Sequence, residues 1–288
     1  MPTRPLLIGR GPWAQKLCAA LPPGVQPTID GHITCKESIR EARVRGNDCI
    51  IIATSANSHY ELLMLALEQK LPVFCEKPMV LRVRDAERVE KAWDAADRPP
   101  FLCDFVHLWS HGFEYAWRRF TAQGGLMNVG GELRPTPKFT AEFSGPVRRK
   151  DAHPVWDYGC HAIAMALMLG YDCRGLALSS GPGDRWLLEN EHVEVIVNTN
   201  SDAEKRACVK LEKVFLYDGE TWDFYRATGR DQPFKNSDAP PLQRALTWFL
   251  SPNRDVWRVH PRSRVGLWLP VQVTRVLESI CSPESPFK

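Results

Sequence analysis

Short apolar runs alternate with helical patterns in the first third of the chain, and this alternation restricts the fold more than any other feature. Three runs have the near-continuous apolar character of strands that are buried on both faces: Leu6–Ile8, Cys49–Ala53 and Leu71–Cys75. Segments with helical spacing of apolar residues, such as Ala14–Leu21 and Tyr60–Leu67, separate them. Strands and helices that alternate in this way form a doubly wound parallel sheet, so we predict an α/β domain.

The second half of the chain has a different character. The segments Val193–Val197 and Cys208–Tyr217 are strand-like and are separated by polar turns, and one helix is predicted over about residues 158–169. We therefore predict an α+β domain with an open, largely antiparallel sheet. Because 288 residues exceed what one compact core usually contains, we expect two domains, over residues 1–106 and 107–288.

Composition excludes several classes of protein. The 37 basic and 34 acidic residues give a formal net charge of +3, which is too balanced to indicate nucleic-acid binding. No apolar stretch approaches the ~20 residues that cross a bilayer, and Met1–Pro5 lacks the apolar core of a signal peptide, so we expect a cytoplasmic protein without a membrane partner. The nine cysteines show no Cys-x-x-Cys pair and no metal-binding spacing, so we expect reduced thiols and no metal site.

A glycine-rich turn follows the first apolar run. The residues Gly9-Arg10-Gly11-Pro12-Trp13-Ala14 fit the G-x-G-x-x-G/A fingerprint of dinucleotide binding, in which the second glycine lets a pyrophosphate approach the backbone. We expect residues 9–13 to contact the cofactor at the amino end of the next helix. Asp30 is the candidate for the adenosine ribose, whereas Arg10 would favour a ribose phosphate, so the choice between NAD and NADP stays open.

The tripeptide Glu76-Lys77-Pro78 ends the apolar run Leu71–Cys75. The carboxyl ends of buried parallel strands border the ligand crevice, where a lysine reaches cofactor and substrate together and can donate a proton. A surface turn of the same composition is the alternative. Far downstream, the chain contains Asp157-Tyr158-Gly159-Cys160-His161, an Asp-x-Gly-x-His pattern on a predicted helix.

The order of these motifs, together with the segment Ala53–His59, resembles that of the glucose-fructose oxidoreductase and inositol dehydrogenase (Gfo/Idh/MocA) family. The resemblance implies an amino-terminal Rossmann domain that binds NAD or NADP. It also implies a carboxy-terminal sheet domain that contacts the substrate and often forms a dimer face. Further candidates for cofactor contacts are Thr54, Ser55, His59, Glu76 and Lys77.

By the same resemblance, Lys77 lies beside the reacting carbon and hydroxyl, Asp157 orients the substrate or partners the base, and His161 exchanges the proton. The chemistry agrees, because hydride transfer from a secondary alcohol needs a group that accepts the hydroxyl proton, and histidine titrates near neutrality. Simpler alternatives stay open. Asp157 also suits a helix amino-terminal cap, His161 a packed core position, and His59 a plain helix start.

The chain departs from the family pattern in three places. The segment after Asp30 is short, Lys150–Trp156 replaces a glycine-rich stretch, and Phe105–Phe113 lacks the arginine often found there. His153 and Trp156 either shape the substrate pocket, because an imidazole and an aromatic face suit a polyhydroxylated ring, or pack internally.

These features favour an NAD(P)-dependent oxidoreductase that transfers a hydride between nicotinamide and a secondary hydroxyl or ketone of a sugar, cyclitol or related small polar molecule. The catalytic residues would be Lys77, Asp157 and His161. Two alternatives stay open: an imine or enone reductase of the same fold, which needs His161 less, and a non-catalytic regulatory protein that senses NAD(P). The resemblance also implies a homodimer.

Overall fold

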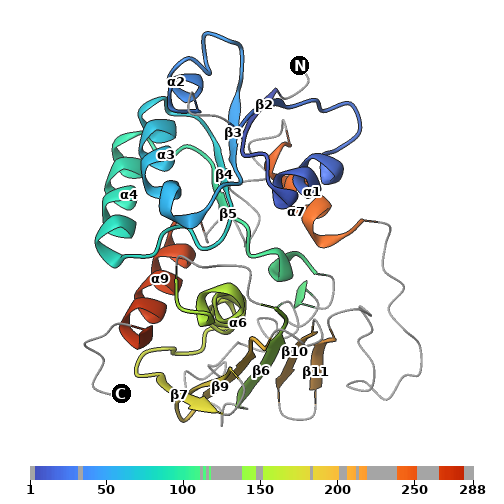
Figure 1. Cartoon of the computed structure of the whole chain (residues 1–288), viewed down its shortest axis with the longest axis vertical. Helices are drawn as coiled ribbons and strands as arrows, with labels where there is room; N and C mark the ends of the chain where they lie inside the picture. The colour runs from blue at the N-terminus through green and yellow to red at the C-terminus, as the bar shows by residue number, and fades with distance from the viewer. Residues whose placement is uncertain are drawn as a thin grey trace, which may run out of the picture. The chain divides into compact units, whose positions relative to one another are not determined.

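The computed structural model describes residues 4–31, 35–110, 113–114, 117, 138–146, 152–181, 184–200, 206–211, 214–218, 239–251 and 266–281 (Figure 1). The chain divides into two compact units, one of residues 1–105 and 242–275 and the other of residues 106–241 and 276–288. The sequence-based division at residues 106/107 assigned residues 242–275 to the second domain, whereas here they group with the first sheet.

The first unit contains a five-stranded sheet in the order β2-β1-β3-β4-β5. Its strands are β1 (Pro5–Ile8), β2 (Thr28–Asp30), β3 (Cys49–Ile52), β4 (Val73–Cys75) and β5 (Phe101–Cys103). Every neighbouring pair is parallel. The chain adds β2 on one side of β1 and then β3 on the other, so the order reverses between β1 and β3. This reversal is the switch point at which open α/β sheets bind ligands, at the carboxyl ends of the strands.

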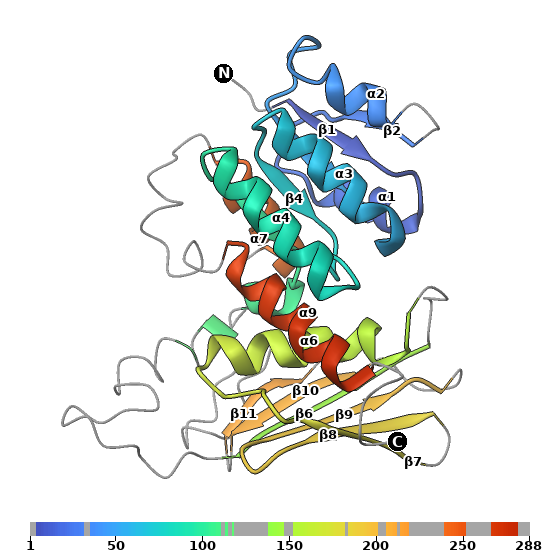
Figure 2. The ribbon, with the colours of Figure 1, turned by 90° about the vertical axis from the view of Figure 1, so that its left-hand side faces the viewer.

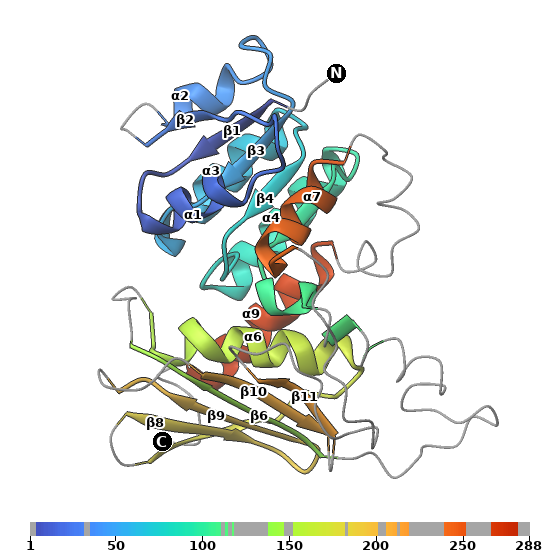
Figure 3. The same cartoon turned by 90° about the vertical axis from the view of Figure 1, so that its right-hand side faces the viewer.

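Helices cover both faces of this sheet. The connecting helices are α1 (Pro12–Ala20), α2 (Cys35–Arg40), α3 (Ala56–Glu68) and α4 (Val83–Ala95), and α7 (Pro241–Phe249) joins them from later in the chain. The residues of α9 (Trp268–Cys281) are divided between the two units. α3 and α4 lie on one face (Figure 2), and α1 and α7 lie on the other (Figure 3). α7 packs through Phe249, whose ring meets Phe74 of β4 edge-on at 5.6 Å between centroids. In the described ranges, no helix combines the length and hydropathy required to span a bilayer.

Strand β3 illustrates why these segments are strands. Ile50, Ile51 and Ile52 are completely buried, because helices cover the sheet on both sides. Their β-branched side chains also suit a pleated strand. Burial of one such side chain contributes about 1.5–3 kcal/mol to stability, so the central strands hold the ligand-binding edge in place.

The second unit contains a six-stranded sheet in the order β11-β10-β6-β9-β8-β7. Its strands are β6 (Phe139–Ser144), β7 (Ala177–Gly181), β8 (Arg185–Glu189), β9 (Val193–Asn198), β10 (Arg206–Leu211) and β11 (Val214–Asp218). β6 and β9 are parallel, and the other neighbouring pairs are antiparallel. The predicted fold class, a doubly wound parallel sheet followed by a largely antiparallel one, is therefore confirmed.

One helix, α6 (Val155–Met168), packs on a face of this second sheet, against β6 and β9. β9 turns Val193, Val195 and Val197 toward the buried side, and all three are completely buried. The 3-10 helix η1 (Val106–Trp109) also contacts α6. The valines of β9 therefore help to set the position of α6.

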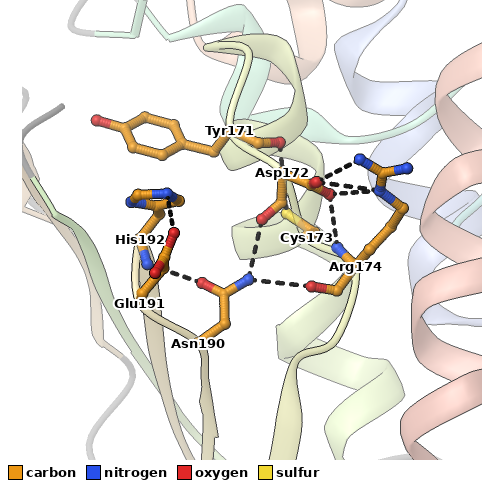
Figure 4. Close-up of polar contacts among 7 residues, drawn as sticks. All are labelled: Tyr171, Asp172, Cys173, Arg174, Asn190, Glu191 and His192. Atoms are coloured by element: carbon orange, nitrogen blue, oxygen red, sulfur yellow. Dashed lines mark hydrogen bonds and ion pairs between the residues drawn. The ribbon is translucent and has the colours of Figure 1, made fainter. Parts of the chain in front are cut away.

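An asparagine fixes the segment that follows α6 (Figure 4). Asn190, between β8 and β9, donates from Nδ2 to the carbonyl oxygens of Asp172 and Arg174, over 3.0 and 3.2 Å. Its Oδ1 accepts from the backbone N–H groups of His192 and Val193, over 2.9 and 2.8 Å. The side chain of Asn190 thus ties the chain after α6 to the β8–β9 turn. In the same segment, hydrogen bonds from Arg174 lower the pKa of the exposed Asp172 carboxyl.

Candidate active site

The glycine turn after β1 has the geometry of an anion-binding loop. Gly9 has a φ of +134°, and a Cβ there would lie 2.9 Å from the carbonyl carbon of Ala53, so glycine is required. Its N–H donates to the carbonyl oxygen of Asp30 over 2.8 Å. Gly11 is the amino-terminal cap of α1, and apart from its chain neighbours no described atom lies within 4 Å of where its Cβ would be. The turn leaves open space at a helix amino end, which suits a pyrophosphate.

Pro12 and Trp13 form the first turn of α1. Pro12 occupies the start of the helix, where its lack of an N–H breaks no hydrogen bond. The Nε1 atom of Trp13 is buried and has no hydrogen-bond partner among the described residues. Lys16 Nζ lies 5.1 Å from the centroid of the indole ring. A buried indole N–H without an acceptor, two residues after Gly11, suits a polar ligand atom.

Asp30 and Arg10 lie at the same edge of the sheet. Asp30 ends β2, is 9% exposed, and accepts a hydrogen bond from the hydroxyl of Ser38 in α2. The side chain of Arg10 covers Gly31, because a Cβ on Gly31 would collide with the methylene groups of Arg10. The carboxylate of Asp30, which is predicted to bind the adenosine ribose, thus accepts a hydrogen bond from α2. Arg10, which is predicted to bind a ribose phosphate, extends over Gly31.

His59 connects the turn after β3 with the turn after β4. Its Nδ1 lies 2.9 Å from the carbonyl oxygen of Pro78, and its Nε2 lies 3.1 Å from that of Thr54. The imidazole is completely buried, so it holds the two turns together, and its predicted contact with the cofactor stays a prediction. Ser55 is the amino-terminal cap of α3, and the Ser58 hydroxyl lies 2.7 Å from Oγ1 of Thr54. Hydroxyl groups therefore border this end of the helix.

Lys77 follows β4, is half-buried and interacts with two buried carboxyl groups. These are Glu76 after β4, 6% exposed, and Asp104 after β5, 1% exposed. Burial raises the pKa of Glu76 well above its usual value, Asp104 raises it further, and Lys77 lowers it. Burial raises the pKa of Asp104 to about 6, and the neighbouring carboxyl group of Glu76 and the charge of Lys77 oppose this shift. The lysine therefore stands beside an interacting acid pair at the ends of two adjacent strands.

Asp104 is a candidate site residue that the sequence patterns missed. Its N–H donates to the carbonyl oxygen of Cys75 over 2.8 Å, so the strand pairing places it beside the end of β4. The signal was present, because Asp104 directly follows the apolar run of β5 just as Glu76-Lys77-Pro78 follows that of β4. A carboxylate at the end of a buried parallel strand deserves the same weight as a lysine there.

α6 carries Asp157 and His161 one helical turn apart. The amino-terminal cap of α6 is Pro154, so Asp157 lies within the first turn and is not the cap that the sequence left open. Both side chains are buried, at 8% and 5% exposure. A Cβ on the intervening Gly159 would already touch Val197 of β9, at 3.7 Å. The glycine of the motif therefore lies where α6 comes close to the sheet.

Aromatic rings surround His161. His107 of η1 meets it edge-on with ring centroids 4.6 Å apart, and Phe143 of β6 stacks on it at 6.2 Å. His107 also meets Phe143 edge-on, at 5.3 Å. The segment Phe105–Phe113, which lacks the arginine of the family pattern, thus places the imidazole of His107 against His161, the residue predicted to exchange the proton. No sequence pattern paired the two histidines, because they are far apart in the chain.

His153 and Trp156 flank the start of α6. His153 is half-buried, its ring meets Trp186 of β8 edge-on at 4.4 Å, and burial lowers its pKa. Trp156 is only 4% exposed. These are features of packing residues, and the predicted substrate contacts of both stay predictions.

The predicted cofactor residues of the first unit gather at one edge of its sheet. Residues 9–13 follow β1, Asp30 ends β2, Thr54 and Ser55 follow β3, and Lys77 follows β4. Asp157 and His161 come from the second unit. Across the part of the chain that the structure describes, no group of three or more His, Cys, Asp or Glu side chains is arranged to hold a metal ion.

A parallel sheet with a glycine turn at its switch point, followed in the chain by a unit built on a mixed sheet, is typical of two-domain, dinucleotide-binding proteins. Residues 32–100 match the family model GFO_IDH_MocA, described as an oxidoreductase family with an NAD-binding Rossmann fold. Over this Rossmann segment the chain is similar to the family that its motifs predicted, and the predicted resemblance is confirmed. The matched segment contains Lys77 but neither the glycine turn nor α6.

Individual relatives agree with this assignment. Inositol 2-dehydrogenase 4 of Saccharopolyspora erythraea is 32% identical over 80 residues, which are 28% of this chain and 23% of that protein. The match thus spans about a quarter of the curated relative. An Agrobacterium radiobacter oxidoreductase in complex with NAD+, L-tartaric acid and magnesium shares the fold, with a TM-score of 0.65 and 17% identity over 100% of this chain and 98% of that one. An inositol dehydrogenase homolog complexed with NAD+ from Azotobacter vinelandii does so with a TM-score of 0.66 and 14% identity over 99% and 95% of the two chains.

Proposed function

We propose that this chain is an NAD-dependent oxidoreductase that transfers a hydride between nicotinamide and a secondary hydroxyl or ketone of a sugar, cyclitol or related small polar molecule. The observation that carries the proposal is the position of Lys77, at the same sheet edge as the glycine turn. A basic side chain and a dinucleotide-binding turn at one edge can act on the same ligand. The family model, whose matched segment contains Lys77, supports redox chemistry.

The residues of the first unit fit a dinucleotide. The open space at Gly11 admits a pyrophosphate, and the Trp13 indole N–H, which has no acceptor in the described residues, lies close in sequence as a donor. Asp30, at the end of β2, stands where an acidic residue binds the adenosine ribose. When bound, nicotinamide supplies the hydride chemistry, and the protein supplies position and proton management.

Lys77 and His161 would divide the work on the substrate oxygen. The hydroxyl proton must leave as the alcohol carbon becomes a carbonyl, and His161 would accept it on a ring nitrogen and return it in the reverse direction. Lys77 Nζ would donate a hydrogen bond to the same oxygen and stabilise its developing negative charge. Asp157, one turn earlier on α6, would orient the substrate. This division requires the lysine of the first unit and the histidine of the second to meet at one substrate atom.

An absorbance assay for NADH tests the proposal. Purified protein is incubated with NAD+ and a panel of polyols led by myo-inositol, because the relative with 32% identity is an inositol 2-dehydrogenase. NADH formation with a panel member, lost in Lys77→Met, is the expected result. Calorimetric binding of NAD+ without turnover of any sugar or polyol would indicate a sensing protein instead. Turnover that survives His161→Ala would show that His161 does not accept the hydroxyl proton. It would favour the alternative of an imine or enone reductase, which needs this histidine less.

We propose NAD rather than NADP as the cofactor. The carboxylate of Asp30 would repel the 2′-phosphate of NADP, and the family model is described as NAD-binding. Arg10 favours NADP instead, because its positively charged side chain extends over Gly31, next to Asp30. Calorimetric Kd values for NAD+ and NADP+ decide the matter. We expect tighter binding of NAD+ in both the wild type and Arg10→Ala, and a preference for NADP+ that Arg10→Ala abolishes would contradict the proposal.

We also propose a homodimer in the cytoplasm. Glu194 and Ile196 of β9 are partly exposed, alternate with the buried valines, and belong to a sheet face that a second copy can cover. Eight cysteines have described side chains, and all eight are free thiols. Free thiols suit the cytoplasm, which keeps cysteines reduced. Sedimentation velocity should give the mass of a dimer, and a monomer at all concentrations would contradict the first part of the proposal.

A further inference from the structure

Glu76 and Asp104 are two carboxyl groups that water barely reaches. They are 6% and 1% exposed, and they follow the neighbouring parallel strands β4 and β5. Oε1 of Glu76 and both carboxylate oxygens of Asp104 are buried without a hydrogen-bond partner among the described residues. If both groups were ionised, these three oxygens would lack donors and the two charges would repel each other, so this state is unfavourable.

One proton resolves the conflict. A proton on Glu76 turns its carboxyl group into a donor, and the carboxylate of Asp104 accepts that hydrogen bond. The pKa shifts agree with this arrangement, because Asp104 raises the pKa of Glu76 whereas Glu76 lowers that of Asp104. Because the pKa of Glu76 is raised by its neighbour and that of Asp104 is lowered by its neighbour, the negative charge of the pair lies on Asp104.

The groups that act on the pair come from the same two strand ends. Lys77 attracts both carboxyl groups, and its backbone N–H makes a hydrogen bond with Glu76. Burial and then the two carboxyl groups raise the pKa of the Cys75 thiol, which therefore stays protonated and neutral. One negative charge on the pair thus matches the one positive charge of Lys77.

We propose that Glu76 and Asp104 share a single proton and act as one monoanionic acid pair that positions Lys77. A single negative charge holds the ammonium group at the strand end. A second one would draw it further into the protein and away from a substrate. The catalytic part of this inference rests on the proposed function, whereas the shared proton does not.

Stability as a function of pH tests the shared proton. A carboxyl group with a raised pKa in the folded protein binds a proton that the unfolded chain has released, so stability falls as pH rises above the usual glutamate value of about 4.3. Glu76→Gln removes this proton and keeps the shape and a donor. The unfolding constant of the wild type, divided by that of Glu76→Gln, should therefore rise by up to about tenfold per pH unit above about pH 5. A ratio that stays constant from about pH 5 to about pH 8 would overturn the proposal.

Infrared spectroscopy gives a second measurement, which uses the wild type and so does not depend on how well a variant folds. A protonated buried carboxyl group has a carbonyl stretch that is separate from the bands of ionised carboxylates. The wild type at neutral pH should show this band, and Glu76→Gln should lack it. Glu61→Gln, which removes an exposed carboxylate from α3, is the matched control and should retain the band. Absence of the band in the wild type would overturn the shared proton.

Kinetics with the substrate found in the NADH assay tests the positioning role. Glu76→Gln and Asp104→Asn each leave one carboxylate beside Lys77, whereas the double variant leaves none. We expect kcat to fall at least about tenfold further in the double variant than in either single one, with less than about a threefold change in KM for NAD+. If the double variant has the same kcat as the single variant with the lower kcat, the claim that the acid pair positions Lys77 is overturned. If the wild type turns over no substrate, the proposed function fails, and the stability and infrared results still decide the shared proton.

Discussion

The two predicted catalytic groups stand in different surroundings. In the first unit, Lys77 follows a buried strand and interacts with the carboxyl groups of Glu76 and Asp104, so charge defines its environment. In the second unit, His161 lies on α6 against the rings of His107 and Phe143, so packing defines its environment. The lysine site should therefore respond to changes of charge at constant shape, and the histidine site to changes of shape as well as chemistry.

The largest effect is expected from Lys77→Met, which removes the charge and keeps a side chain of similar length. We expect kcat to fall about 10³-fold, because a positioned proton donor or charge typically contributes 10²–10⁴-fold. Stability should also fall, because the buried negative charge of Glu76 and Asp104 then loses the positive charge that balances it. The NADH assay measures kcat, and Lys91→Met on an exposed position of α4 is the matched control. A loss smaller than about tenfold would contradict a charge-based role.

Two substitutions of His161 separate its chemistry from its packing. Both His161→Phe and His161→Ala should lower kcat by about 10²-fold or more, because neither side chain exchanges a proton. His161→Phe should keep the ring contacts, whereas His161→Ala should cost about 2–3 kcal/mol of stability through the cavity it leaves. Denaturant unfolding measures the difference, with His192→Ala at the β8–β9 turn as a control. Equal stability of the two variants would show that packing does not define this site.

The two glycines of the turn after β1 offer a comparison within the first unit. Gly9→Ala should lower stability by about 1–3 kcal/mol, because φ is +134° and the new Cβ would crowd Ala53. Gly11→Ala should cost less than about 1 kcal/mol, because the structure has open space there. It should nevertheless weaken NAD+ binding about tenfold or more, because the methyl group occupies the space for the pyrophosphate. Calorimetric binding as tight as in the wild type would contradict this placement of the cofactor.

The smallest expected effect is a pH dependence at His153. Burial lowers its pKa below the usual value of about 6.5, so the folded protein favours the neutral ring. A group with a lowered pKa contributes stability above its unfolded pKa and loses it as pH falls through the folded one. Between about pH 6.5 and pH 5 the wild type should therefore lose slightly more stability than His153→Gln. Denaturant midpoints measure this, and the opposite sign would contradict the packing against Trp186.

Much of the fold follows from local patterns, and the exceptions have tertiary causes. The apolar runs of β1, β3 and β4 indicate buried parallel strands, because helices lie between them in the chain and can cover both faces of the sheet. The spacing of apolar residues identifies α7 as a helix but does not tell which sheet it covers, and the contact of Phe249 with Phe74 places it in the first unit. The run Cys208–Tyr217 contains two antiparallel strands, β10 and β11. The sequence pattern did not separate them, because strand-like residues continue on both sides of the point where the chain reverses.

The candidate site divides in the same way. Lys77 and the glycine turn were predictable, because the rule about strand ends needs only the order of residues along the chain. Asp104 obeys the same rule, but β5 is only three residues long and gives a weak signal. The contact between His107 and His161 was not predictable, because it depends on how η1 packs against α6.

A crystal structure with NAD+ and the polyol found in the assay tests the central claim most directly. We predict that Nζ of Lys77 and a ring nitrogen of His161 both lie within about 3.5 Å of one substrate oxygen, next to the nicotinamide ring. A complex in which the two side chains contact separate regions of the protein, with no substrate atom in common, would contradict the proposed division of the chemistry.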